Sequence, residues 1–96
     1  VLYADTDNKG DYGVTSKQLA QNILAPLVGT MQLLNRGVVD SPKMVVLRKT
    51  DMPSVLIECG FVSCPTDRAI LRDEGRIDGI ANAIASGIGE TLGMIK

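Results

Sequence analysis

The feature that most constrains the fold is a short apolar run, residues 55–57 (Val-Leu-Ile), with Pro53 before it and Gly60 after it. A run of this length between turn residues is typical of a strand buried on both faces. Glu58 follows at its carboxyl end, where ligands bind in open α/β sheets. A buried carboxylate costs free energy unless it is paired, hydrogen-bonded or bound to a metal. Glu58 is therefore either a functional carboxylate or a side chain that has left the sheet and is solvated or paired with an arginine.

The size and charge of the chain narrow its class. Its 96 residues suffice for one small domain, and 45% hydrophobic with 22% charged residues is typical of a soluble globular protein. The net charge is −1 without any basic run, so no nucleic-acid partner is expected. No apolar stretch approaches the roughly 20 residues of a membrane span. The chain opens on a strand-like run without a signal peptide, which leads us to expect a piece of a larger domain.

The cysteines and the absence of histidine limit the chemistry. Without histidine, a histidine-based zinc site or a Ser-His-Asp triad cannot be built from these residues alone. Cys59 and Cys64 are separated by four residues, and they could pair only if a tight turn brought them together. We therefore expect two free thiols. The pair is also a weak metal signal, because a structural zinc takes about four ligands.

The first part of the chain predicts a strand, a surface loop and a long helix. Residues 1–4 are typical of a strand, and the polar stretch after them predicts a loop. Thr15 or Ser16 can cap the helix that follows, and Gly37 is a natural left-handed stop. Pro26 should kink this helix or divide it in two. Its apolar positions recur every three to four residues: Leu19, Ile23, Leu27, Met31 and Leu34.

The second part predicts two strands and two helices. The strands are residues 44–47 and 55–58. One helix begins at Pro65, which suits a first helical position, and runs to about Glu74, with Gly75 interrupting it. The last helix contains glycines that weaken it by roughly 1 kcal/mol each against alanine. Its stability must therefore come from packing on the sheet, with close backbone approach at the glycines. The apolar face comprises Ile77, Ile80, Ala81, Ile84, Ile88, Leu92 and Ile95. The predicted fold class is α/β, with a small sheet of about three strands and long packing helices.

Four parts of the chain together resemble a known pattern. Residues 16–20 (SKQLA) resemble an S-x-x-L-A helix start, and residues 35–38 (NRGV) an N-R-G-V turn. Residues 46–48 (VLR) and 52–58 (MPSVLIE) resemble V-L-R and M-P-x-V-L-[IV]-E strands. Residues 60–67 (GFVSCPTD) resemble G-F-[IVL]-S-N-P-x-[DE], with Cys64 where Asn is usual. On these motifs the chain resembles the zinc-dependent N-acetylmuramoyl-L-alanine amidases of the amidase_3 type, which are bacterial cell-wall hydrolases.

This resemblance implies that residues 1–96 are the carboxyl-terminal portion of one amidase domain with a larger twisted sheet. In that family two His and one Glu of the preceding half hold zinc, so zinc is expected in the parent domain and not in this chain alone. Glu58 matches the glutamate beside the reacting water, and its implied role is general base and then general acid. The implied reaction is hydrolysis of the amide between N-acetylmuramic acid and L-Ala of peptidoglycan, outside the cell or in the cell wall.

Two arginines are candidate substrate contacts. Arg36 and Arg48 lie on motif turns of that family, and an arginine can hold a stem-peptide carboxylate through two parallel hydrogen bonds. The alternative is that each is a surface cation or the partner of a nearby carboxylate.

Three functions stay open. The first is a hydrolase half-domain that is inert alone and active when joined to its other half. The second is a non-catalytic module that binds cell-wall fragments or a protein and keeps the amidase fold. The third is a small thiol protein using Cys59 or Cys64, which lacks both a C-x-x-C motif and a histidine. An incomplete sheet would expose a strand edge, so the missing half or another copy of the chain is the expected partner.

Overall fold

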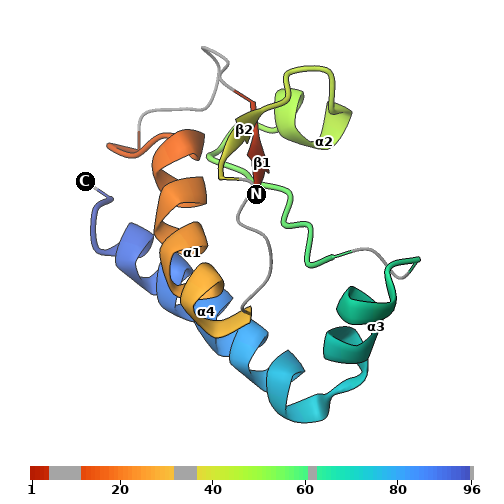
Figure 1. The fold of residues 1–96 in the computed structure, drawn as a ribbon. Helices are drawn as coiled ribbons and strands as arrows, with labels where there is room; N and C mark the ends of the chain where they lie inside the picture. The colour runs from red at the N-terminus through yellow and green to blue at the C-terminus, as the bar shows by residue number, and fades with distance from the viewer. Residues whose placement is uncertain (5–11, 32–36, 61–62, 96) are drawn as a thin grey trace.

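The computed structural model describes residues 1–4, 12–31, 37–60 and 63–95 and shows a small α/β fold (Figure 1). Its two strands are β1 (Leu2–Tyr3) and β2 (Val39–Asp40). The helices of the described residues are α1 (Ser16–Met31), α2 (Val45–Arg48), α3 (Pro65–Arg72) and α4 (Glu74–Leu92). The predicted α/β class is confirmed.

β1 lies in the middle of the small sheet. It pairs in parallel with β2, with Leu2 opposite Val39 and Tyr3 opposite Asp40. On its other side, Leu2 and Leu56 exchange two backbone hydrogen bonds of 2.8 and 2.9 Å in an antiparallel bridge. A third segment of the chain is thus joined to the sheet through one residue pair.

The strand predicted at residues 44–47 is wrong, because these residues enter α2. The Arg48 N–H donates to the Met44 carbonyl, four residues back, over 2.9 Å. Leu47 is buried and its neighbours in α2 are exposed, which suits one helical turn and not the alternation of a strand. The second strand of the sheet is instead β2, just upstream.

The strand predicted at residues 55–58 is reduced to the bridge at Leu56. Residues 55–57 are half-buried, so the prediction of a strand buried on both faces is also wrong. Within the described part of the chain, β1 is the single strand that pairs with this segment.

α1 begins with a reciprocal pair of hydrogen bonds. The Gln18 N–H donates to Thr15 Oγ1 over 3.1 Å, and the Thr15 N–H donates to Gln18 Oε1 over 2.7 Å. This capping box satisfies two backbone donors at the helix start, so Thr15 is the cap. Ser16, the other candidate, is buried and accepts a hydrogen bond from the Ser54 N–H over 3.1 Å. The helix continues through Pro26 as one element and is not divided there.

Several predictions fall outside the described residues. They are most of the loop at residues 5–13, Leu34, and the end of the first helix at Asn35 and Arg36. Gly37, which follows, has a positive φ of 72°, as expected for a left-handed stop. Among the described residues, no helix is long and apolar enough to cross a membrane.

Asp73 separates α3 from α4. Pro65 occupies the first turn of α3, as predicted, and the helix ends at Arg72. Asp73 is extended, with ψ of 112°, and its Oδ1 accepts hydrogen bonds from the N–H groups of Gly75 and Arg76 over 3.0 and 3.3 Å. The predicted interruption at Gly75 is therefore wrong, because Gly75 lies in the first turn of α4 and the break falls on the capping residue.

α4 packs lengthwise on α1 (Figure 1). The helices approach so closely at Gly87 that a Cβ there would lie 2.5 Å from Ile23 Cα. The core cluster between them consists of Ile23, Leu27, Ile80 and Ala83. α4 turns its small residues toward α1, so the predicted apolar face is confirmed only in part. Ile80 is buried and Ile84 half-buried, whereas exposed positions are Ile77, Ile88, Leu92 and Ile95.

Candidate active site

Glu58 stands on an extended segment whose alternate side chains are anchored in the core. Val55, Ile57 and Cys59 all pack against the core cluster between α1 and α4. Successive side chains of an extended chain point to opposite sides. Glu58 therefore projects away from these helices, and its side chain is exposed. Its carboxylate is available to a substrate without a burial cost.

The pairing of the strands fixes the edge of the sheet at which Glu58 emerges. Because Leu56 runs antiparallel to Leu2, Glu58 lies level with the beginning of β1. The amino nitrogen of Val1 donates to the Gly37 carbonyl over 3.3 Å, so Gly37 lies at the same edge. Glu58 and Gly37 lie on opposite sides of β1. Two strand spacings place them about 10 Å apart.

The structure does not bring Arg48 and Glu58 together. α2 follows the carboxyl end of β2, and the parallel register places that end beside the end of β1. Arg48 thus lies at the edge opposite to Glu58, and it is exposed. Arg36 lies outside the described residues, but Gly37, the next residue, is at the Glu58 edge.

The backbone adopts an unusual conformation two residues after Glu58. Gly60 has φ of +136°, a conformation that L side chains rarely adopt. A Cβ on Gly60 would lie 3.2 Å from Asp67 Cβ and 3.3 Å from Asp67 Oδ2. Asp67 belongs to the first turn of α3, so this contact joins the Glu58 segment to that helix.

Both cysteines are free thiols, as predicted. Cys59 packs against the core, and Cys64 directly precedes α3. Among the described residues, no group of three or more His, Cys, Asp or Glu side chains could hold a metal ion. Glu58 by itself provides one carboxylate, whereas a catalytic zinc needs three protein ligands.

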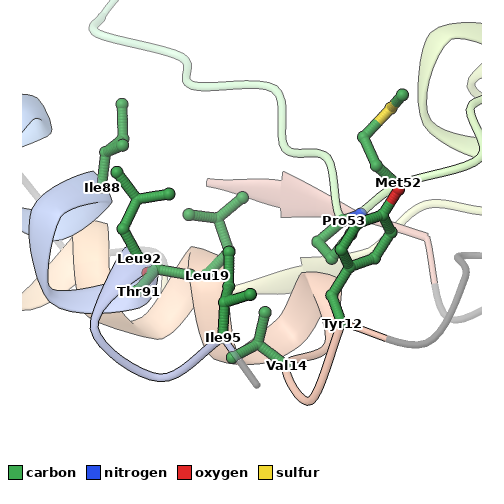
Figure 2. Close-up of a pocket in the computed structure, with 9 residues that line it drawn as sticks. All are labelled: Tyr12, Val14, Leu19, Met52, Pro53, Ile88, Thr91, Leu92 and Ile95. Atoms are coloured by element: carbon green, nitrogen blue, oxygen red, sulfur yellow. The ribbon is translucent and has the colours of Figure 1, made fainter.

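A pocket of about 310 Å³ lies between one end of the chain's helical layer and the Met52–Pro53 turn (Figure 2). Because residue 53 precedes the antiparallel bridge at Leu56, this pocket is at the edge of the sheet opposite to Glu58. Its walls come from the start of α1 with the residues before it, the Met52–Pro53 turn and the carboxyl end of α4. The lining residues are Tyr12, Val14, Leu19, Met52, Pro53, Ile88, Thr91, Leu92 and Ile95. Among the described residues, the side chains that line it include no carboxylate, thiol or basic group. Sequence reasoning missed this pocket, although the spacing of Ile88, Leu92 and Ile95 placed these side chains on one face.

Comparisons with known proteins agree with the sequence motifs. The family model described as "Amidase_3: N-acetylmuramoyl-L-alanine amidase" matches residues 1–90. The chain is 38% identical over 73 residues to N-acetylmuramoyl-L-alanine amidase AmiC of Neisseria meningitidis, covering 76% of this chain and 17% of that protein. It is 35% identical over 72 residues to the probable cell wall amidase LytH of Staphylococcus epidermidis, covering 75% of this chain and 24% of that protein.

A solved structure is similar over nearly the whole chain. The crystal structure of N-acetylmuramoyl-L-alanine amidase from Clostridium difficile 630 matches with a TM-score of 0.81 and 32% sequence identity. The match covers 95% of this chain and 46% of that chain. The present chain thus spans less than half the length of each of these relatives.

Proposed function

The chain belongs to the Amidase_3 family of N-acetylmuramoyl-L-alanine amidases, and on this premise we propose that residues 1–96 are the carboxyl-terminal part of a peptidoglycan amidase domain. The domain hydrolyses the amide that joins the lactyl group of N-acetylmuramic acid to L-Ala of the stem peptide. Its substrate, peptidoglycan, places the reaction in the cell envelope.

The observation that carries this proposal is the placement of Glu58. An exposed carboxylate on a segment whose neighbouring side chains are anchored in the core is both accessible and held in place. A Glu58 carboxylate oxygen takes the proton of the attacking water and then delivers it to the leaving nitrogen of L-Ala. The zinc ligands would come from the other half of the domain, and a zinc ion held there would supply Lewis-acid chemistry to the reaction.

The surface of α4 supports a larger domain. A helix of 19 residues is about 28 Å long, whereas β1, β2 and the bridge at Leu56 form a sheet only about 10 Å across. Apolar side chains at both ends of α4, such as Ile77 and Leu92, are consequently exposed. Further strands from an amino-terminal half would cover them and would carry the zinc ligands that this chain lacks.

The two arginines differ in how well their placement supports a substrate contact. Arg36 directly precedes a residue at the Glu58 edge, which supports a contact with the stem-peptide carboxylates. Arg48 lies at the other edge, where the alternative of a surface cation accounts better for its exposure. Both assignments can be tested kinetically.

A second candidate is a non-catalytic module that keeps the amidase fold and binds cell-wall fragments. The absence of histidine from all 96 residues favours it, because the chain cannot supply the family's zinc ligands.

The decisive experiment uses the complete domain, meaning this chain joined to an amino-terminal half that carries those ligands. Incubation with peptidoglycan should release new amino termini on L-Ala. Binding of peptidoglycan without such release would overturn the amidase proposal in favour of the binding module.

A further inference from the structure

We propose that Gly60 and Asp67 form a latch that positions Glu58 for catalysis, a role that rests on the proposed function. The latch is the contact between the Gly60 backbone and the Asp67 side chain. It lies two residues beyond Glu58 in the sequence and holds the end of the Glu58 segment close to α3. Neither residue touches the reacting atoms, so both are positioning residues.

The backbone of Gly60 is the first part of the argument. Its φ of +136° lies in a region that is open to glycine and costly for an L side chain. Gly37 also has a positive φ, but nothing lies within 4 Å of the position of its missing Cβ, whereas Gly60 has the Asp67 side chain there. A side chain at position 60 would therefore be strained by its φ and would also lie in tight contact with Asp67.

The contact with Asp67 is the second part. Cβ, Cγ and Oδ2 of Asp67 would lie 3.2–3.3 Å from a Cβ at position 60, which is tighter than ordinary van der Waals contact. Because Asp67 is in the first turn of α3, it can move aside only if it changes its rotamer or the helix shifts. The glycine thus lets the end of the Glu58 segment lie close against α3.

The third part of the argument is that the backbone on both sides of Glu58 is restrained. The backbone is held at Leu56 by the bridge to β1, and Ile57 and Cys59 are packed against the core on either side of Glu58. The latch at Gly60 completes this restraint, leaving mainly the side-chain torsions of Glu58 to vary. A general base must lie within hydrogen-bond reach of the proton it takes, and a displacement of 1 Å can cost about 10²-fold in rate.

The test compares Gly60→Ala with Gly89→Ala in the complete domain. Nothing lies within 4 Å of a Cβ at Gly89, so this variant is the matched control. We expect Gly60→Ala to lower kcat by about 10²-fold with KM and bound zinc per chain unchanged, and Gly89→Ala to leave all three unchanged. A KM and zinc content that stay constant separate misplacement of Glu58 from general loss of structure. Unchanged kcat in folded, zinc-loaded Gly60→Ala would overturn the latch.

A residue of opposite chirality keeps the test decisive if Gly60→Ala does not fold. Peptide ligation at Cys59 allows D-alanine to be placed at position 60 in a synthetic carboxyl-terminal segment. D-alanine favours positive φ and directs its methyl away from Asp67, so we expect kcat near that of the unmodified enzyme. A folded, zinc-loaded D-alanine variant whose kcat is lowered by about 10²-fold would contradict the proposal. Glu58→Gln in the same assay separates the latch from the proposed function. If Glu58→Gln keeps full turnover, the proposed function fails. If Glu58→Gln loses turnover and Gly60→Ala does not, the latch fails.

Discussion

The Cα of Ile23 lies where a side chain at Gly87 would have to begin, because a Cβ built on Gly87 would be only 2.5 Å away from it. The Asn22 carbonyl oxygen would be 2.7 Å away. Both obstacles are backbone atoms of α1, which cannot rotate out of the way as a flexible side chain could. The distance between α1 and α4 is therefore set by the absence of a side chain at one position.

Gly87→Ala should lower the free energy of unfolding by about 1–3 kcal/mol, because the helices must separate to admit the methyl group. This loss outweighs the gain in helix propensity that alanine brings. Gly89→Ala, on the same helix with open space around it, should instead raise the stability by up to about 1 kcal/mol. Urea denaturation of the two variants should give shifts of opposite sign. A stabilising Gly87→Ala would contradict the close helix contact.

Asp73→Ala should destabilise the chain by about 0.5–2 kcal/mol, because the N–H groups of Gly75 and Arg76 lose their acceptor at the start of α4. Asp78→Ala removes the same charge from an exposed position further along α4 and should change stability by no more than about 0.5 kcal/mol. Thermal unfolding followed by circular dichroism measures both. Equal effects of the two substitutions would mean that charge, and not capping, is responsible.

Glu58→Gln in the complete domain should lower kcat by about 10²–10⁴-fold while zinc stays bound, because the amide cannot accept the proton of the water. Zinc stoichiometry and turnover are measured on the same preparation. Loss of zinc would show that Glu58 is a ligand. Full turnover with zinc retained would show that the carboxylate is structural.

Arg36→Ala and Arg48→Ala test the proposed substrate contacts. If either arginine holds a stem-peptide carboxylate, its removal should raise KM more than it lowers kcat, because the contact is present in both the bound substrate and the transition state. We expect the larger rise in KM from Arg36→Ala, since its neighbour Gly37 lies at the Glu58 edge. Steady-state kinetics on peptidoglycan fragments measure KM and kcat of both variants. Unchanged KM and kcat in both would show that neither arginine contacts the substrate.

The exposed apolar end of α4 should cause association. Leu92 is 61% exposed beside the apolar pocket, so the isolated chain should self-associate or bind the complementary half-domain. Leu92→Gln should weaken this association in sedimentation experiments. Glu90→Gln places the same side chain two residues away on the same helix and should have no such effect. A wild-type chain that stays monomeric at all concentrations and does not bind the complementary half-domain would refute this prediction.

Local signals predicted the fold where one residue determined the structure. Thr15 caps α1 and Pro65 opens α3, because capping and the fixed φ of proline act within one turn. Strands of two residues, such as β2, are too short to show any alternation, and their pairing is decided by partners far away in the sequence. For the same reason the apolar residues 44–47 suggested a strand where a helical turn forms.

The candidate site was predictable in its chemistry and not in its geometry. Glu58 could be singled out from the strand that precedes it, but its exposure follows from how few strands surround that segment. Nothing in the sequence alone indicated that Arg48 would lie at the opposite edge, because this depends on the parallel register of β1 and β2. The contact of Gly60 with Asp67 likewise needs coordinates, since a glycine in sequence does not reveal its φ.

The bridge between Leu2 and Leu56 also bears on how the protein folds. It joins residues 54 positions apart through two hydrogen bonds, so a long loop must close before either bond forms. Closing such a loop costs more entropy than forming contacts between residues that are close in the sequence. This cost slows folding. α1 can form early from local hydrogen bonds, whereas the Glu58 segment must wait until β1 is in place. In a newly synthesised chain the Glu58 segment would thus reach its place only after β1 and Leu56 have met, later than helices that form from neighbouring residues.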